Sequence, residues 1–413
     1  MDYKELKIVK YNNNDDNKQE YQKRFSTIGV IKTEMYPSLM KRDLPKERDY
    51  PLFVVPLLEV QLLSQQIQEN SNTIKELANA LPAIAKEQFY KEQLYKSIID
   101  TNEIEGVKTT RKEVSEAFKA LSQKGKNHKI RLLSTVRMYH DIITQEDLRI
   151  DSINIIREIY DNLTDGEIEG DNALDGYLFR DGYINILDEN TGKLEHLPPT
   201  EEKTILIMLS SWISFINDRT VPFLIKASLS HFFFENVHPF YDGNGRTGRY
   251  ILSRYLSRKL DIFSGLVISQ KIKENKKKYY KAFKTTGDYD NKAEGTFFVI
   301  TILQMLKEGQ DDIISILEDK KSLLDNFSTK LDNLKERSEL QKRILYLVFQ
   351  STVFVDNSKD GIRDNDIIAI LSAHYPKKTI KDTIKQLRQE EVIEQKTKAP
   401  SRHILKIEKV FND

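Results

Sequence analysis

The sequence contains no cysteine and no long run of apolar residues. Without cysteine the chain forms no disulfide bond, and cysteine-ligated zinc, iron–sulfur clusters and a thiol nucleophile are excluded. A membrane-spanning helix needs about 20 consecutive apolar residues, and no part of the chain provides them. Residues 1–20 also lack the apolar core behind a basic start that marks a secretory signal. We therefore expect a soluble protein of the cytoplasm without a membrane partner.

A large net charge is also absent, since 64 lysines and arginines face 63 aspartates and glutamates. A surface for nucleic acid would therefore have to be regional rather than global. The composition, 39% hydrophobic and 31% charged, is that of an ordinary globular protein. Because 413 residues exceed the size of a typical domain, we expect about two or three folded units.

Helical periodicity dominates the chain after residue 50. Apolar side chains recur there every three or four positions, as amphipathic helices require. Residues 176–199 break this pattern, because the alternation in YINIL, the turn-forming Asp-Glu-Asn-Thr-Gly and a double proline predict a β-hairpin. The fold should therefore be mainly α. The expected division is an N-terminal arm with little independent structure (1–50), an N-terminal helical region (51–140), a core (141–310), a linker helix (311–335) and a C-terminal domain (336–413).

Residues 238–249 read HPFYDGNGRTGR and combine small, basic and acidic residues. The small residues at 243–245 allow successive backbone amides to point into one concavity. A helix that starts near Arg246 would add the positive end of its dipole. Arg246 and Arg249, three residues apart on its first turn, would present guanidinium groups to the same phosphates. The segment therefore predicts an anion-binding cradle.

Asp242 would repel a phosphate in this cradle unless a cation lay between them. Magnesium is suited to this position, because it prefers one or two carboxylates together with phosphate oxygens and water. His238 stands at the end of the preceding helix and suits a general base for an incoming hydroxyl. A plain glycine-rich turn between two core helices would explain the glycines but neither these two residues nor the arginines. We therefore expect a magnesium–nucleotide site.

The segment resembles the signature of the Fic family, HxFx(D/E)GNGRxxR, at every specified position. The matching residues are His238, Phe240, Asp242, Gly243, Asn244, Gly245, Arg246 and Arg249. The resemblance implies a helical Fic core that transfers AMP from ATP to a Ser, Thr or Tyr hydroxyl of a protein, including itself. It implies that His238 is the base, that Asp242 binds Mg²⁺ and that Arg249 binds the γ-phosphate. The phosphate-binding residues implied are Gly243, Asn244, Gly245, Arg246 and Arg249.

Two further stretches agree with this resemblance. The predicted hairpin lies where Fic proteins have a flap that aligns a target segment by strand pairing. The run ENKKKYYKAF resembles the stretch that contributes to the adenine pocket, which makes Tyr280 a candidate for ATP binding, with Tyr279 and Asn275 as further candidates. An ordinary amphipathic helix with buried tyrosines would explain the same run.

Residues 101–106, TNEIEG, fit the family's inhibitory pattern (S/T)xxxE(G/N) through Thr101, Glu105 and Gly106. The resemblance implies that Glu105 pairs with Arg249 and occupies the place of the γ-phosphate, so that the isolated enzyme inhibits itself. In such relatives the same glutamate can position a water molecule that removes AMP from the modified protein, so de-AMPylation is a second activity. A surface carboxylate near a helix end is the simpler alternative.

The last 78 or so residues predict three helices followed by two short strands, which is the order of a winged helix-turn-helix. The basic helix KKTIKDTIKQLRQ, residues 377–389, suits a recognition helix. The candidate DNA contacts are Lys377, Lys381, Lys385 and Arg402. A solvated basic face or a surface that binds protein would account for the same residues.

Two functions therefore remain open at the level of sequence. The first is an autoinhibited protein adenylyltransferase whose target protein is unknown. The second is a DNA-binding transcriptional regulator whose Fic core senses a nucleotide or removes AMP. A homodimer is compatible with both, since members of the family often dimerise.

Overall fold

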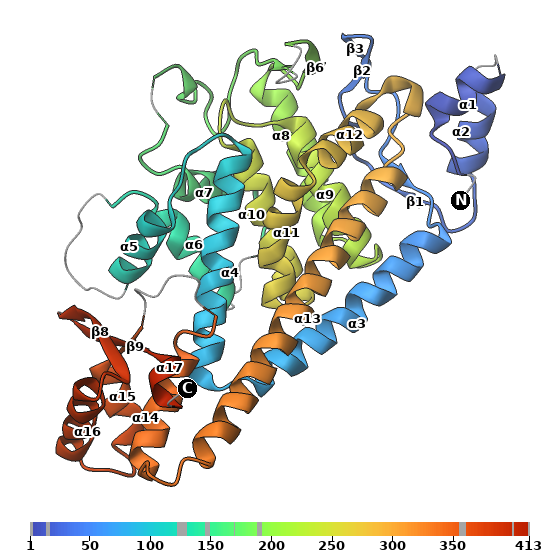
Figure 1. Ribbon diagram of the computed structural model, residues 1–413. Helices are drawn as coiled ribbons and strands as arrows, with labels where there is room; N and C mark the ends of the chain where they lie inside the picture. Colours follow the sequence, from blue (N-terminus) through green and yellow to red (C-terminus); the bar gives the residue numbers. More distant parts are fainter. Residues whose placement is uncertain are drawn as a thin grey trace. The chain divides into compact units, whose positions relative to one another are not determined.

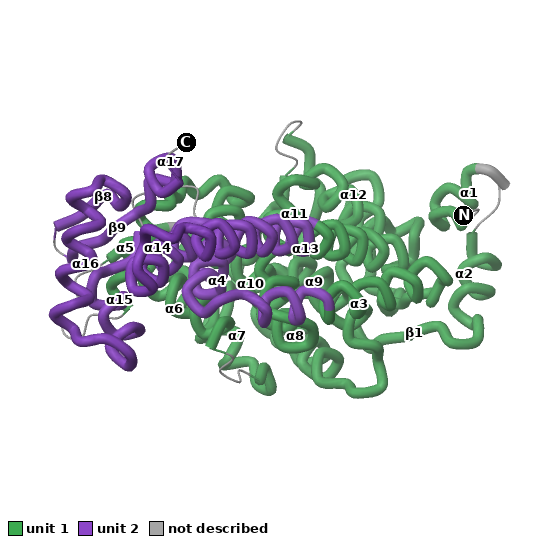
Figure 2. Tube along the Cα trace, turned by 60° about the horizontal axis from the view of Figure 1, so that its bottom comes forward, with its two compact units in different colours: residues 1–72, 94–311 green, residues 73–93, 312–413 purple. Residues whose placement is uncertain are grey.

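Helices make up most of the computed structural model, and its sheets are small, which confirms the mainly α fold. The structure describes residues 3–13, 17–121, 130–144, 149–168, 170–187, 192–354, 361–398 and 400–411. Contacts divide the chain into two units, each assembled from two separate stretches (Figure 2). Residues 1–72 and 94–311 form unit 1, and residues 73–93 and 312–413 form unit 2. The helices that run from one unit into the other are α3 (Leu58–Ala80), α4 (Ala83–Ile104) and α13 (Thr296–Asp332).

The core of unit 1 is a bundle of helices around α9 (Phe223–Val237) and α10 (Asn244–Lys259) (Figure 1). The sequence of α9, FLIKASLSHFFFENV, distributes apolar residues over all sides of the helix, and nearly all of its residues are buried. Helices α8 and α10 pack against α9, and α11 packs against α10. The other helices of this bundle are α5 (Arg111–Leu121), α6 (Leu133–Thr144), α7 (Ile153–Leu163), α8 (Glu202–Asn217), α11 (Ile262–Glu274) and α12 (Lys276–Gly287).

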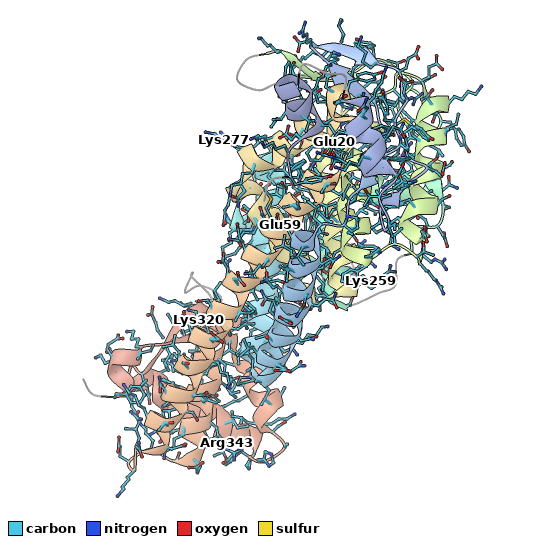
Figure 3. All side chains as sticks on the ribbon, turned by 90° about the vertical axis from the view of Figure 1, so that its right-hand side faces the viewer. Glu20, Glu59, Lys259, Lys277, Lys320 and Arg343 are labelled. Atoms are coloured by element: carbon cyan, nitrogen blue, oxygen red, sulfur yellow. The ribbon has the colours of Figure 1, made fainter. Side chains whose placement is uncertain are left out.

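The first 50 residues form short elements that pack against other parts of unit 1. Arg24 pairs with Glu294 at 2.9 Å and with Glu20, which Figure 3 labels, at 2.8 Å. The expected arm therefore has local structure, and part of what holds it is contact with residues far along the chain. Its elements are α1 (Leu6–Asn13), α2 (Lys18–Phe25), β1 (Ile31–Lys32), β2 (Leu39–Lys41) and β3 (Leu44–Lys46), with β1 paired to β4 (Phe53–Val54) and β2 paired to β3.

The predicted hairpin is confirmed in unit 1. Strands β5 (Ile186–Leu187) and β6 (Leu194–His196) pair antiparallel, with Ile186 opposite His196. Most of the predicted turn, residues 188–191, lies outside the described residues. Short 3₁₀ helices occur at η1 (Gly170–Asn172), which precedes the hairpin, and at η2 (Tyr289–Asn291).

The C-terminal part of unit 2 contains the three predicted helices followed by the two predicted strands, together with a two-residue strand before the second helix and a short last helix that the sequence did not predict. A capping box of Ser338 and Gln341 starts its first helix. The apolar side chains Ile380, Ile384 and Leu387 of α16 are buried, which leaves its charged side chains outside. The elements are α14 (Glu339–Gln350), β7 (Ile362–Arg363), α15 (Asp364–Leu371), α16 (Lys377–Gln389), β8 (Ile393–Lys398), β9 (Ser401–Leu405) and α17 (Ile407–Val410). The strands form an antiparallel sheet in the order β7-β9-β8.

In the part of the chain that the structure describes, no helix combines the length and the apolar character that a membrane span requires.

Candidate functional site

The turn between α9 and α10 carries the motif, and its own side chains hold its shape. The Asn244 carboxamide accepts a bond from the Phe240 amide at 2.9 Å and donates one to the Phe240 carbonyl at 2.7 Å. The buried Phe240 ring stacks on Tyr160, with ring centroids 3.7 Å apart. Gly243 has a φ of 80°, a left-handed conformation that favours glycine. Helix α10 begins at Asn244, two residues before the start that the sequence indicates.

His238 lies at the C-terminal end of α9 in a left-handed conformation, with φ 50° and ψ 63°. Burial above all, together with the nearby His196 ring and the positive charge of Arg180, lowers the pKa of its imidazole well below the ordinary value. The ring is therefore neutral at physiological pH, which is the protonation state that a base needs.

Arg246 and Asp242 lie on either side of the small residues of the loop. The buried guanidinium of Arg246 forms an ion pair with Glu167, a residue that follows α7. Asp242 is partly exposed and accepts a bond from the Gly243 amide at 2.6 Å. Among the described residues, no group of three or more His, Asp or Glu side chains could hold a metal ion. A single carboxylate beside the backbone amides of the loop fits magnesium, whose other ligands would be phosphate oxygens and water.

Arg249 contacts the three-residue inhibitory pattern at the end of α4. Its Nη2 lies 2.8 Å from Oε1 of Glu105, and its guanidinium donates to the hydroxyl and the carbonyl oxygen of Thr101, both at 2.9 Å. Burial alone would lower the pKa of Arg249, but the nearby Glu105 carboxylate raises it above the ordinary value. The guanidinium is therefore a buried cation whose counter-ion is a side chain of the same chain.

Two glycines make this contact sterically feasible. Gly106, with a φ of 74°, follows the last turn of α4, and the Val107 amide donates back to the Asn102 carbonyl at 2.9 Å, as in a Schellman motif. A Cβ atom at Gly245 would stand 2.2 Å from Oε1 of Glu105, so a side chain there would displace the carboxylate. The glycine of the loop thus leaves room for the end of α4.

The tyrosine candidates on α12 have different environments. Tyr279 is buried, and its hydroxyl lies 2.7 Å from Nε2 of His231. Tyr280 is 38% exposed, with the Lys276 ammonium 5.6 Å from its ring centroid. Asn275 is the residue between α11 and α12. The buried position of Tyr279 fits the simpler interpretation of an amphipathic helix, whereas Tyr280 remains accessible to a ligand.

Several polar residues around the turn belong to no sequence motif, and the sequence did not predict them as part of the site. Glu167 pairs with Arg246, and Arg180 is fully buried next to the His238 turn. Burial raises the pKa of Glu235 to about 8, so this carboxyl is mostly protonated at neutral pH. The signal in the sequence was weak: an arginine just before the hairpin, and two glutamates in ordinary surroundings.

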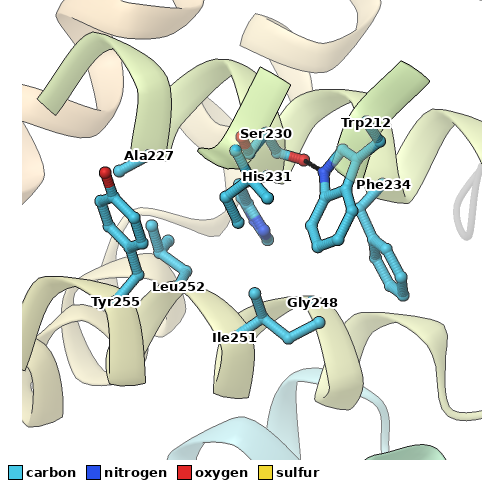
Figure 4. A pocket seen from close by; sticks show the side chains of 10 residues that line it. Trp212, Ala227, Ser230, His231, Phe234, Gly248, Ile251, Leu252 and Tyr255 are labelled. Atoms are coloured by element: carbon cyan, nitrogen blue, oxygen red, sulfur yellow. Dashed lines mark hydrogen bonds between the residues drawn. The ribbon is translucent and has the colours of Figure 1, made fainter. Parts of the chain in front are cut away.

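A small cavity lies between α8, α9 and α10, behind the motif (Figure 4). Its volume of about 10 Å³ has room for a single water molecule and not for a nucleotide. Trp212, His231 and Gly248 are among the residues that line it, and the Trp212 indole donates to the Ser230 carbonyl at 2.8 Å. We therefore regard it as a packing defect of the core.

The candidate DNA contacts in unit 2 fall into two groups. Lys377, Lys381 and Lys385 are exposed on α16. Arg402 lies on β9, and its guanidinium donates to the carbonyl of Gly361, the residue before β7, at 2.9 Å. The lysines are therefore better placed than Arg402 to meet a partner.

Comparison with known proteins agrees with this geometry. The model of the Fic/DOC family matches residues 150–256, so the chain contains a Fic domain that includes the motif. A probable protein adenylyltransferase of Aquifex aeolicus is 32% identical over 102 residues, which is 25% of this chain and 28% of that protein. The protein adenylyltransferase Fic of Drosophila melanogaster is 30% identical over 97 residues, 23% of this chain and 19% of that protein. The matched segment thus spans less than a third of these curated relatives.

A solved structure extends the likeness of fold beyond the Fic domain. The crystal structure of a Fic family protein from Desulfovibrio desulfuricans G20 aligns with 84% of this chain and 96% of its own, with a TM-score of 0.52. The two sequences are 17% identical, so the likeness concerns the fold alone.

Proposed function

We propose that the chain is a protein adenylyltransferase, which moves AMP from ATP to a serine, threonine or tyrosine hydroxyl of a protein, and that it inhibits itself through Glu105. The observation that carries the proposal is the contact of Glu105 with Arg249 beside a complete Fic motif. Arg249, the cation that would bind the γ-phosphate, is already paired with the Glu105 carboxylate of the same chain.

The transfer follows from the positions of the motif residues. Neutral His238 takes the proton of the target hydroxyl while the hydroxyl oxygen attacks the α-phosphorus of ATP. A new oxygen–phosphorus bond forms, and the bond from the α-phosphorus to the bridging oxygen breaks. Pyrophosphate leaves with that electron pair.

The loop and the arginines would bind the phosphates during this step. The amides at the start of α10 and the guanidinium groups of Arg246 and Arg249 would hold the chain of phosphates. When bound, magnesium would neutralise phosphate oxygens, and Asp242 would be its protein ligand. Because Arg246 pairs with Glu167, that ion pair would have to open or rearrange to admit ATP.

The inhibition follows from competition for one buried cation. The γ-phosphate and the Glu105 carboxylate are both anions, and both would occupy the same side of Arg249. ATP could then bind only in a displaced position, or only when the end of α4 moves away. The Glu105 side chain is 27% exposed, so water also reaches it, and the same carboxylate could orient a water molecule for de-AMPylation.

The deciding experiment compares the wild type with Glu105→Gly, each incubated with magnesium and either α-labelled or γ-labelled ATP, followed by denaturing electrophoresis. We expect protein-bound label only from the α position and more of it in the variant. Glu103→Gly is the matched control, because Glu103 lies on the same helix and pairs with Lys273 instead. Label from the γ position would indicate a kinase. Equal labelling by the wild type and Glu105→Gly would remove the inhibitory role.

A second candidate function concerns unit 2, which we propose contains a winged helix that binds DNA. It is favoured by the exposed lysines of α16, Lys377, Lys381 and Lys385, beside a small antiparallel sheet. The Fic domain would then sense a nucleotide or remove AMP on behalf of a transcriptional regulator.

A further inference from the structure

Arg180 is a fully buried cation that contacts main-chain oxygens on both sides of the catalytic turn. Its Nε donates to the carbonyl of His238 at 2.8 Å, and its Nη2 approaches the carbonyl of Val237 at 3.4 Å. Its own backbone amide donates to the carbonyl of Pro239 at 3.1 Å. One residue therefore touches three consecutive residues of the motif turn.

The same guanidinium also reaches the segment that leads to the hairpin. Its Nη1 donates to the Gly182 carbonyl at 2.7 Å. In the part of the chain that the structure describes, no ion pair involves Arg180. Its partners are instead carbonyl oxygens, two of which belong to the C-terminal end of α9, where the helix dipole is negative and carbonyls lack helical partners.

The protonation state of Arg180 suits this environment. Burial lowers the pKa of the guanidinium to about 10, against the opposing influence of Tyr241 and Asp175. The group therefore remains a cation at neutral pH, and it donates to carbonyls that would otherwise be poorly satisfied.

The turn that Arg180 holds is an unfavourable one. His238 has a left-handed backbone conformation, which a residue with a side chain adopts only where its surroundings enforce it. The bond from Arg180 restrains the plane of the peptide that follows His238, and so it helps to hold the backbone from which the imidazole projects.

The segment that carries Arg180 is itself anchored. Asp175 accepts bonds from the Asp181 amide at 2.7 Å and from the Tyr241 hydroxyl at 2.8 Å. The Glu202 carboxylate, at the start of α8, accepts bonds from three successive amides. These amides belong to Tyr177, Leu178 and Phe179. Arg180 thus projects from a rigid support, which gives its contacts with the turn a defined direction.

We propose that Arg180 is a positioning residue of the transfer reaction, which locks the backbone of His238 and ties it to the base of the hairpin that would present the target hydroxyl. One side chain would then fix the position of the base relative to the target hydroxyl. This inference rests on the proposed function of the Fic domain.

The test uses Arg180→Met and Arg180→Lys in the full-length Glu105→Gly protein, so that transfer is not inhibited. A misplaced base lowers the rate of transfer but leaves the affinity for ATP unchanged. For Arg180→Met we therefore expect kcat to fall by about 10-fold to 100-fold with little change in the KM for ATP. Arg180→Lys keeps the charge but cannot span the carbonyls, and its loss should be intermediate.

The pH profile separates positioning from a general loss of structure. Burial is the main cause of the low imidazole pKa of His238, and the guanidinium of Arg180 adds a positive charge that lowers it further. His196 on β6 also faces His238, but burial lowers its own pKa to about 4, so it is neutral at physiological pH. Removing the Arg180 charge raises that pKa, so less neutral base is present in acid. The acid limb of the kcat profile should therefore move to higher pH in Arg180→Met, and it should move less in Arg180→Lys.

Arg157→Met is the matched control, because Arg157 also donates to a main-chain oxygen of the same segment, that of Leu178 at 3.0 Å, and lies outside the turn. It should leave kcat and the acid limb unchanged. A folded Arg180→Met protein with unaltered kcat and acid limb would overturn the inference.

A readout without turnover distinguishes a failure of the inference from a failure of the proposed function. The titration of the His238 ring, followed by NMR with labelled histidine, should shift to higher pH in Arg180→Met even if no AMP transfer is found. If Glu105→Gly shows no transfer but the ring titration shifts, the proposed function fails and the contact between Arg180 and His238 stands. An unshifted titration would contradict the contact itself.

Discussion

His238 has two properties that its position in the sequence alone did not reveal. Its backbone is left-handed, and its imidazole is kept neutral by burial and by neighbouring positive charge. The left-handed backbone sets the direction in which the chain leaves α9, and the neutral imidazole has one ring nitrogen free of a proton over the physiological range. A neutral imidazole suits a base, because its unprotonated ring nitrogen can accept the proton of an incoming hydroxyl.

The role of His238 is testable by His238→Ala in the Glu105→Gly protein. We expect AMP transfer to fall by about 10² to 10⁴ fold, the usual size of a general-base contribution. Affinity for a fluorescent ATP analogue should change little, because the phosphates are assigned to Arg246, Arg249 and the loop amides. A parallel loss of ATP binding would show that the histidine is structural.

At the same scale, the sequence supplied the identities of the motif residues but not all of their partners. The glycines of the loop, Asp242 and the arginines were recognisable because they lie within one short segment. Glu167 and Arg180 were not, because neither belongs to a local pattern. Arg180 lies 58 residues from the histidine whose carbonyl it contacts.

Among the elements, α10 matters most, since it carries both arginines of the motif and packs closely on α11. A Cβ atom at Gly265 of α11 would stand 2.3 Å from the Ser253 carbonyl and 2.8 Å from the Ser257 amide. These are backbone atoms, which cannot move aside as a flexible side chain does. The two helices therefore approach each other through a glycine.

Gly265→Ala should separate α10 from α11 and lower the free energy of unfolding by about 1 to 3 kcal/mol, the usual cost of overpacking. Gly287→Ala, at the end of α12, is the matched control, because its Cβ would meet no atom within 4 Å. Chemical denaturation of the two variants and the wild type measures the difference. Equal stability of both variants would show that the helices can adjust without cost.

The hairpin is the element that the sequence predicted best. Alternation and turn residues are local properties, so β5 and β6 could be located from the sequence without any knowledge of their neighbours in space. The elements within residues 3–50 were harder to predict, since the contact of Arg24 with Glu294 that helps to hold them comes from a distant segment.

For the whole molecule, the division into two units depends on how the chain passes back and forth between them. From the sequence, a change in composition at about residue 335 predicts the boundary of the C-terminal domain. The contacts instead assign residues 73–93 to the same unit as the C-terminal stretch. Helices α3 and α4 run through both units, and no local composition marks the point at which such a helix passes from one core to the next.

The proposed DNA binding by unit 2 is also tested on the whole chain. Lys381→Ala combined with Lys385→Ala should weaken binding to duplex DNA and reduce the slope of log affinity against log salt by about 1 for each phosphate that the variant no longer neutralises. AMP transfer in the Glu105→Gly protein should be unaffected. Absence of any salt-dependent gel shift in the wild type would favour a protein partner for this face.

The sequence by itself determined the helical class, the hairpin, the three helices and two of the strands in the C-terminal part, and the identity of the motif residues. Each of these depends on side chains that are close together in the chain, where periodicity and spacing fix the outcome. The pairing of Glu105 with Arg249 was implied by resemblance to a family rather than by spacing.

The tertiary structure alone decided which distant side chains complete the site. It brings Thr101 to Arg249 across 148 residues of sequence, pairs Arg246 with Glu167 and places Arg180 beneath the His238 turn. Such contacts depend on how buried charges and carbonyls find partners once water is excluded. That requirement acts through space, so the linear order of residues does not reveal it.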